Sequence, residues 1–404
     1  MKNMNIEWDR HIKEGEIASM ASDLVKIPSY SHMDRQEEKV AAYILSLLAA
    51  EGIEAWLQEV EPGRPNVIAR IVGEGGGRSL MLSGHMDTVP AYGMKDPFGG
   101  AVADGVIYGR GACDMKGALA SMIAAVIGIK RAGVKLCGTL YFTGVIDEEE
   151  QGKGTAELIR KGPYADAVIV GEGTGLRVAT GNKGLEWIEI IVHGKKVHGG
   201  AMEKGINAIT QAAKLITRIE NDYVPKLKER THPLLGNATL NFGTIRGGDQ
   251  PSTVPGSCVI QIDRRWLPSE TVGQVYGELQ EVIDGLRRED PRFNAKIQDM
   301  FSGKDLLVHK PFHTDESDGI VRSAQYCLER AGSLPTGPVP CPAWTDAGYM
   351  SNYTDSSCII LGPGDLSLAH SEEDMVLTSD LYKAALIYAD IAVDYCGLAE
   401  EKDA

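Results

Sequence analysis

Histidine and carboxylate side chains are concentrated in short polar segments that border apolar runs of the sequence. These side chains bind zinc-class metal ions through nitrogen and oxygen, and a carboxylate can also act as a general base. Their repeated placement at the ends of apolar runs therefore indicates a metal site that also holds a candidate general base. The candidate residues are His85, Asp87, Asp114, Glu148, Glu149, Glu172 and His370.

Each of these residues also has a simpler explanation when it is considered alone. Asp114 precedes an expected helix, where Asp is an ordinary N-cap, and the acidic run 147–150 fits a solvated loop. His85 and Asp87 lie two residues apart, which fits a turn as well as a metal ligand whose second ring nitrogen contacts a carboxylate. Adjacent acids point in different directions, so one Glu of the run can bind metal while its neighbour acts as the base. We expect Cys113 to be buried packing rather than a ligand.

Strand and helix patterns alternate in the first half of the chain. This alternation predicts an α/β domain whose mainly parallel sheet is flanked by helices. In such sheets, functional loops gather at the carboxyl ends of the strands, so the candidate residues are expected to converge there. The expected strands are 66–72, 80–83, 138–146 and 167–170, and the expected helices are 40–50 and 117–130.

The pattern changes near residue 183 and returns after residue 302. Between them the order is strand, helix, strand, strand, helix, strand, which is typical of a small two-layer, ferredoxin-like α+β domain. We therefore expect an inserted domain at 183–302, between the first part (1–182) and the second part (303–404) of a larger catalytic domain. The expected elements are 185–192, 206–220, 238–245, 257–263, 272–286 and 293–300.

Composition narrows the class of protein. A length of 404 residues favours two domains, and a formal net charge of -15 argues against a nucleic-acid partner. Seven cysteines without a CxxC pair suggest reduced thiols and a cytoplasmic setting. The charged start, 1–16, shows no signal peptide, and the longest apolar stretch, 119–129, is too short to span a membrane. We expect that stretch to be a buried core helix.

Taken together, these segments resemble the co-catalytic zinc family of aminoacylases, acetylornithine deacetylases, succinyl-diaminopimelate desuccinylases and glutamate carboxypeptidases. The resemblance runs from the N-terminal part of the chain to near its end, and the conjunction of motifs is far more specific than any one of them. The matching segments are GHMDTVP, DPFGGAVADGVIYGRGACDMKG, DEEEQGKGT, GEGT, GKKVHGG with GINAI, DRRWLPSE, and GPGDLSLAHSEEDMV.

The resemblance implies a dinuclear zinc centre. His85 and Glu172 would hold one zinc ion, Glu149 and His370 the other, and Asp114 would bridge them. Cobalt or manganese can replace zinc at sites built from nitrogen and oxygen ligands.

The resemblance also implies catalytic roles. Asp87 would orient His85, and Glu148 would be the general base. His198, in the inserted domain, would polarise the scissile carbonyl and would reach the neighbouring subunit of a homodimer formed through that domain. The inserted domain would thus act as a lid and as the dimerisation domain.

The implied reaction is cleavage of the amide bond of a small anionic N-acyl amino acid or short peptide. Arg265 resembles a substrate-carboxylate contact, and Arg246 and Lys183 are further candidates for binding the anion. The alternatives are a metallo-dipeptidase or glutamate-type carboxypeptidase, a hydrolase with a single metal ion, and a non-catalytic metal-binding relative. Ser252 departs from the family pattern, in which Asn is more usual, and this leaves the substrate open.

Overall fold

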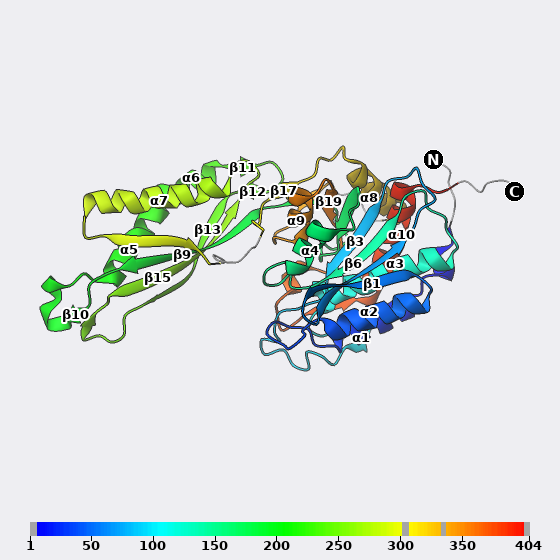
Figure 1. Ribbon diagram of the computed structural model, residues 1–404, viewed down its shortest axis with the longest axis horizontal. Coiled ribbons are helices and arrows are strands. Elements are labelled where there is room, and N and C mark those ends of the chain that lie inside the picture. Colours follow the sequence, from blue (N-terminus) through cyan, green and yellow to red (C-terminus); the bar gives the residue numbers. More distant parts are fainter. Residues whose placement is uncertain (1–5, 301–306, 333–336, 400–404) are drawn as a thin grey trace. The chain divides into compact units, whose positions relative to one another are not determined.

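A computed structural model describes residues 6–300, 307–332 and 337–399. The chain divides into two compact units, of which the first comprises 1–181, 314–341 and 345–404 and the second comprises 182–313 and 342–344 (Figure 1). The division at 181/182 lies next to the predicted boundary, whereas residue 302 lies outside the described residues. Residues 307–313 belong to the second unit rather than to the predicted catalytic part. This segment runs beside the start of strand β9 (Gly184–His193), where the backbone N–H of Leu185 donates to the carbonyl of His309 at 2.9 Å.

A mixed sheet organises the first unit. Its strands follow the order β1-β2-β6-β3-β7-β19-β8, with β18 paired to β8. The four central strands, from β6 to β19, are mutually parallel, and the pairs β1-β2 and β2-β6 at one edge are antiparallel. The α/β class is confirmed, with the parallel arrangement in the middle of the sheet. The strands are β1 Glu54–Glu61, β2 Arg64–Ile71, β3 Leu80–His85, β6 Leu140–Val145, β7 Ala167–Val170, β8 Ala179–Asn182, β18 Val339–Pro340 and β19 Ser357–Ile360.

Helices cover both faces of this sheet. Alternate residues of β2 explain the two layers, since Val67 and Ala69 join the large core whereas Ile68 packs with Leu158 on the opposite face. The larger layer contains α1 Glu14–Val25, α2 Glu38–Ala50, α3 Gly117–Arg131, α8 Gly319–Arg330 and α10 Thr378–Cys396, and the smaller layer contains α4 Lys153–Lys161 and α9 Asp346–Tyr353. A separate small sheet is formed by β4 Ala101–Ala103, β5 Val106–Tyr108 and β20 Met375–Leu377.

Helix α3 is an apolar helix in the core of the first unit. The segment Ala112–Arg131 is long and apolar enough to cross a membrane by length and composition alone, but all of its most apolar window is buried inside the protein. Its small and branched side chains pack against α1 and α10. The expectation of a buried core helix is met.

The second unit is a two-layer α+β sandwich. Its sheet has the order β13-β15-β9-β16, and each neighbouring pair is antiparallel, as in a ferredoxin-like fold. Helices α5 and α7 pack their apolar stripes on one face of the sheet (Figure 1), and a capping box between Thr271 and Gln274 begins α7. The elements are β9 Gly184–His193, β10 Val197–His198, α5 Ala208–Arg218, α6 Val224–Glu229, β11 Thr231–His232, β12 Gly236–Asn237, β13 Thr239–Gly247, β14 Thr253–Val254, β15 Ser257–Trp266, α7 Val272–Glu289, β16 Asn294–Asp299 and β17 Phe312–His313.

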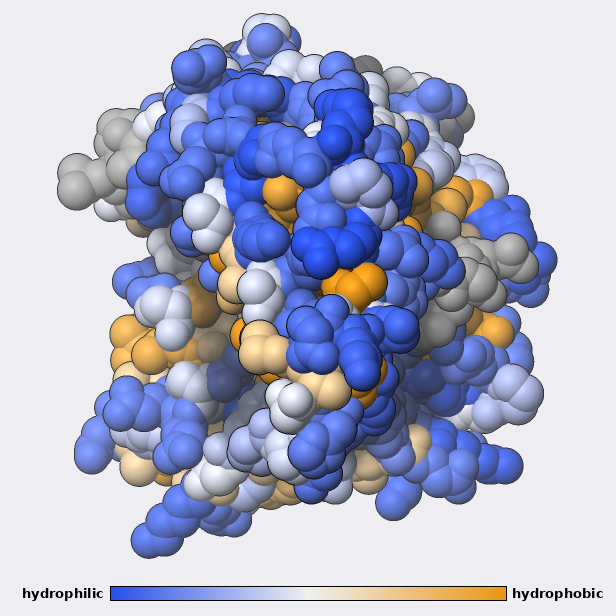
Figure 2. Space-filling model, turned by 90° about the vertical axis from the view of Figure 1, so that its left-hand side faces the viewer, coloured by the Kyte–Doolittle hydropathy of each residue, from blue (hydrophilic) through white to orange (hydrophobic). Residues whose placement is uncertain are grey.

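The surface is dominated by polar residues on the face that Figure 2 presents. Hydrophilic side chains cover most of that face, and apolar residues occur in small separate areas. This distribution agrees with the net charge of -15 and with a surface that favours solubility.

Candidate metal centre

The candidate ligands follow the carboxyl ends of the four parallel strands at the centre of the sheet. His85 ends β3, Glu148 and Glu149 follow β6, Glu172 follows β7, and the segment leading to His370 follows β19. Because these strands are parallel neighbours, their ends lie along one edge of the sheet. The topology therefore brings together residues that are separated by nearly three hundred positions in the sequence.

Asp114 lies between the two histidines. Its Oδ1 is 3.0 Å from Nε2 of His85, and its Oδ2 is 3.3 Å from Nε2 of His370. The carboxylate is buried in the turn that precedes α3. Because each oxygen faces a different imidazole, Asp114 has the arrangement required of a ligand shared by two cations.

A second carboxylate accompanies each histidine. Oε2 of Glu149 is 2.9 Å from Nε2 of His370, and Oε1 of Glu172 is 3.6 Å from Nε2 of His85. His85 is almost completely buried, whereas the side chain of His370 is 51% exposed. The result is two imidazole–carboxylate pairs, one on each side of Asp114.

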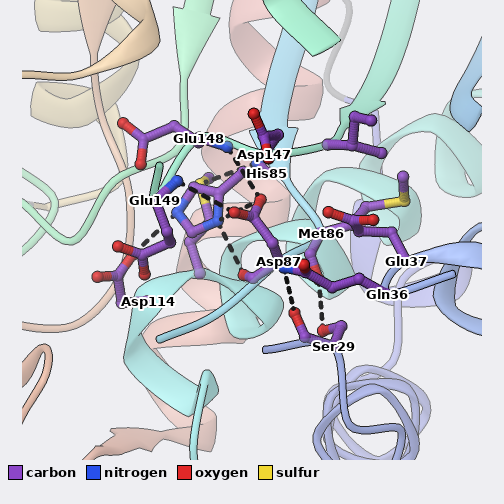
Figure 3. A network of polar contacts seen from close by, with 12 residues as sticks. Ser29, Gln36, Glu37, His85, Met86, Asp87, Asp114, Asp147, Glu148 and Glu149 are labelled. Carbon is purple, nitrogen blue, oxygen red and sulfur yellow. Dashed lines mark hydrogen bonds and ion pairs between the residues drawn. The ribbon is translucent and has the colours of Figure 1, made fainter. Parts of the chain in front are cut away.

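Asp87 connects His85 to the acidic loop after β6, as Figure 3 shows. Its Oδ1 and Oδ2 accept the backbone N–H groups of Glu148 at 3.2 Å and of Glu149 at 3.0 Å. Nδ1 of His85 lies 3.0 Å from the carbonyl oxygen of Asp87 and 3.6 Å from its Oδ1. Asp87 thus fixes the orientation of His85 mainly through its backbone, and its carboxylate fixes the loop that carries the two acids.

Glu148 is half-buried and lies beside His85 and Glu172. One ligand-type atom from each of these three residues lies within 4.8 Å of the others. Burial raises the pKa of Glu148 well above its usual range, and His85 acts in the opposite direction. A carboxyl group with a raised pKa is suited to accept and return a proton near neutral pH.

The electrostatics of the cluster fit bound cations. Burial raises the pKa values of Glu149 and Glu172, and the neighbouring charge of Asp114 adds to the effect. Burial also acts on Asp114, but hydrogen bonds with His370 and His85 outweigh it and hold its pKa low. Oε1 of Glu149 is buried and has no hydrogen-bond partner among the described residues. Several carboxylates gathered out of water, one of them with an unused oxygen, form a donor set that suits divalent metal ions.

A buried ion-pair network supports the acidic loop, and sequence patterns gave no signal for it. Arg64 donates to both oxygens of Glu37, at 2.7 and 2.6 Å, and to Oδ1 of Asp147 at 3.2 Å. Asp147 directly precedes Glu148 and has a φ of 68°, which is uncommon for a residue other than Gly. These partners are far apart in the sequence, so only the folded chain reveals that Arg64 holds the turn before Glu148.

Cys113 is buried beside the centre, and its thiol donates to the carbonyl of Asp365 at 3.3 Å. Burial raises the pKa of this thiol, which fits the expected packing role.

His198 lies in the second unit, where β10 pairs with β14. It is exposed, and Nδ1 accepts the backbone N–H of Gly200 at 3.1 Å. A neutral ring that accepts at Nδ1 carries its proton on Nε2. His198 therefore presents an N–H donor at the surface of this unit.

The three candidate anion-binding residues do not form one cluster. Arg265 is paired with Asp263, which accepts from Nε at 2.8 Å and from Nη2 at 3.0 Å. Burial lowers the pKa of Lys183, and the positive charge of Arg265 contributes. Strand pairing sets Arg265 opposite Leu185, two residues after Lys183. Arg246 lies near the opposite end of the sheet, since β13 pairs it with Val259 of β15. Only Lys183 and Arg265 can act at the same place.

Comparisons with known proteins agree with this geometry. The family model for Peptidase family M20/M25/M40 matches residues 81–394. The chain is 27% identical over 417 residues to the N-formyl-4-amino-5-aminomethyl-2-methylpyrimidine deformylase of Bacillus subtilis, with 96% of each protein covered. It is 28% identical over 367 residues to the acetylornithine deacetylase of Myxococcus xanthus, covering 88% of this chain and 91% of the relative.

A solved structure shows the same fold. The aminopeptidase PepT from Bacillus cereus has a TM-score of 0.78 and 22% identity, with 95% of this chain and 99% of that chain covered. The family match includes every candidate ligand from His85 to His370. The chain accordingly belongs to Peptidase family M20/M25/M40 and is an enzyme that hydrolyses amide bonds.

Proposed function

We propose that this enzyme is a dinuclear zinc-dependent deacylase that removes the acyl group from a small anionic N-acyl amino acid. The observation that carries the proposal is Asp114, whose two carboxylate oxygens face the imidazoles of His85 and His370 at 3.0 and 3.3 Å. One imidazole and one carboxylate would complete the coordination on each side. The deacylase assignment draws support from relatives that are named as a deacetylase and a deformylase.

The ligand set defines what the cofactor contributes. His85 with Glu172 would hold one zinc ion, His370 with Glu149 would hold the other, and Asp114 would be shared. Two zinc ions held there would supply Lewis acidity and would lower the pKa of a bound water molecule. Cobalt or manganese would also suit these nitrogen and oxygen ligands.

Glu148 would move the proton during the reaction. It stands beside His85 and Glu172, and Asp87 holds its backbone N–H. Burial keeps its pKa raised, so Glu148 can take a proton from the attacking water and return it to the leaving amine. Such a positioned base contributes about 10²–10⁴-fold to the rate.

The second unit would contribute substrate-binding groups. His198 would donate from Nε2 to the carbonyl oxygen as negative charge develops, and Arg265 would bind the substrate carboxylate. Burial, with a contribution from the positive charge of Arg265, lowers the pKa of Lys183. The same two causes lower the pKa of His309 to about 4. These basic surroundings support an anionic ligand near Arg265.

The positions of His198 and Arg265 within one unit support a homodimer. His198 pairs with Thr253, just before β15, and Arg265 is near the other end of that strand. The nine residues of extended strand from Ser257 to Arg265 span about 25 Å, which is longer than a small N-acyl amino acid. Both residues can meet one substrate only if one of them comes from a second copy of the chain, as in a symmetric dimer.

All seven cysteines are free thiols, which suits the cytoplasmic location that we infer.

Metal analysis followed by a substrate panel tests the deacylase proposal. Purified enzyme should contain two metal ions per chain and should hydrolyse N-acetyl, N-succinyl or N-formyl amino acids faster than dipeptides. Glu148→Gln should keep both metal ions and lose about 10²–10⁴-fold in kcat. Glu150→Gln is the matched control, since Glu150 is the next acid of the same loop and should leave kcat unchanged. A preference for dipeptides would favour the metallopeptidase alternative, and full activity of Glu148→Gln would remove the assigned base.

Mixing two inactive variants tests the shared site. Glu148→Gln and His198→Ala, unfolded together and refolded, should regain about a quarter of wild-type activity, because half of the dimers are mixed and each of these has one complete site. If His198 acts within its own chain, the mixture should stay as inactive as its components.

A further inference from the structure

One buried ion pair links the loops that carry the metal ligands. The side chain of Arg110 is 1% exposed, and that of Asp374 is fully buried. Nη1 of Arg110 donates to Oδ2 of Asp374 at 3.0 Å. Among the described residues, neither side chain forms a hydrogen bond or ion pair with a candidate metal ligand. The mechanism above uses neither residue.

Asp374 fastens the loop that leads to Asp114. Its Oδ2 also accepts the backbone N–H of Gly111 at 2.7 Å, and its Oδ1 accepts that of Cys113 at 2.8 Å. Its own carbonyl accepts the N–H of Gly109 at 3.1 Å. The residue just before Asp114 is therefore held by a carboxylate from the loop that contains His370.

Arg110 fastens two further segments. Nη2 donates to the carbonyl of Ser371 at 2.9 Å, and Nε donates to the carbonyl of Pro90 at 3.1 Å. Ser371 directly follows His370, and Pro90 lies on the segment that continues from His85 and Asp87. The planar guanidinium thus joins three ligand-bearing loops at fixed angles, which a Lys ammonium cannot do.

The two halves of the centre depend on this pair to different degrees. His85 is a residue of β3, and Glu172 lies two residues after β7, next to Gly171, whose N–H donates to the carbonyl of Ser83 in β3; the hydrogen bonds of the sheet therefore hold them. His370 lies outside regular secondary structure, has a φ of 60° and is half exposed. Its distance from Asp114 is set mainly by what holds the neighbouring backbone.

We propose that the Arg110–Asp374 pair is a positioning clamp that sets the metal site formed by His370, Glu149 and Asp114. The inference rests on the proposed dinuclear function and extends it to residues outside the ligand set. Weakening the clamp lowers the affinity for the second metal ion and leaves the first, at His85 and Glu172, bound. Partners of metal ligands typically affect affinity by about 10–100-fold, and we expect this range for the second ion.

The test is a zinc titration of the metal-free enzyme against a chromophoric chelator, repeated with cobalt to record the visible spectrum of each equivalent. Wild type should bind two equivalents. Asp374→Asn should bind the first as wild type does and the second about 10–100-fold more weakly, and the spectral change should be confined to that second equivalent. Glu270→Gln is the control, because Glu270 also pairs with a buried arginine, Arg264, and also accepts a backbone N–H, that of Leu267, in the second unit. The control should bind both equivalents normally.

Several outcomes would overturn the clamp. Unchanged affinity for the second equivalent in Asp374→Asn refutes it alone, as does an equal loss of both equivalents in a folded variant. A wild-type enzyme that binds one equivalent refutes the dinuclear function first and the clamp with it. If Asp374→Asn does not fold, Arg110→Lys is the deciding variant. Lysine keeps the positive charge but cannot donate to the carbonyls of Ser371 and Pro90 at the same time, so this variant should lose affinity for the second equivalent only. Normal binding of both equivalents would refute the clamp.

Discussion

Asp87 holds the backbone of two adjacent acids, and its replacement by Asn tests whether this hold positions Glu148. The carboxylate is fully buried and accepts the N–H groups of Glu148 and Glu149, one on each oxygen. Asn has nearly the same shape but only one acceptor oxygen, so its NH₂ group must face one of the two N–H donors. The substitution removes a hydrogen bond without opening a cavity.

The expected magnitude follows from the contacts. A buried N–H that loses its acceptor costs about 1–3 kcal/mol of folding free energy. Part of this cost is offset. Burial, with a smaller contribution from the charge of Asp87, raises the pKa of Glu37 and of Asp147, both to about 6, and the substitution relieves the repulsion from Asp87. We therefore expect a loss of stability near the lower end of the range. The effect on activity should be larger, about 10–100-fold in kcat/KM, since the loop carries both the base and a ligand.

Urea unfolding of the metal-loaded enzyme measures the first quantity, and steady-state kinetics on a confirmed substrate measures the second. Thr88→Val is the matched control, because Thr88 is the next residue, is equally buried, and its hydroxyl has no hydrogen-bond partner. It should leave both quantities close to wild type. An Asp87→Asn enzyme with unchanged kcat/KM would show that the two N–H contacts do not position Glu148, and a Thr88→Val enzyme as impaired as Asp87→Asn would point to general disruption of the segment.

Three further predictions concern pH, packing and substrate binding. Burial raises the pKa of Glu148 and of Glu172, so the folded metal-free protein binds their protons more tightly than the unfolded chain does. The free energy of unfolding should therefore fall as pH rises from about 4.5 through the raised pKa values. With chelator present, the urea midpoint should be higher at pH 5 than at pH 7. Added zinc should reverse this order, whereas an identical midpoint at both pH values without metal would contradict the burial argument. Phe142→Ala in the core should cost about 3–5 kcal/mol in denaturant unfolding while the folded fraction stays active, and a cost below about 1 kcal/mol would mean that the site collapses around the cavity. Arg265→Ala should raise KM more than it lowers kcat, and Arg246→Ala, at the other end of the sheet, should change neither; equal effects of the two would contradict their separation.

Local patterns determined most of the elements. The apolar run of 167–170 coincides with β7, and the expected helix 117–130 differs from α3 by one residue at its end. Periodicity works at this level because each strand or helix must bury its own apolar side chains. The same reasoning predicted the two-layer fold of the inserted unit, since an alternating strand pattern and an amphipathic helix pattern differ in period.

The candidate ligands were also visible in the sequence, because chemistry restricts residue type. His85, Asp114 and His370 stood out as metal-type side chains at the ends of apolar runs, and the resemblance supplied their roles. The resemblance favoured Arg265 as the carboxylate contact, with Arg246 as a further candidate. The sequence did not show that Arg246 lies at the other end of the sheet, because that distance depends on strand register.

What only the tertiary structure decided is which distant residues hold the site in place. Arg64 meets Glu37 and Asp147, and Arg110 meets Asp374, across separations that no local pattern encodes. Arg110 and Asp374 lie within the matching segments, but neither the residue type nor the spacing shows that they pair. Their pairing depends on how the loops pack in the folded chain. The residues that bind metal can thus be recognised from their chemistry, whereas those that position them are recognised from contacts that exist only in the folded chain.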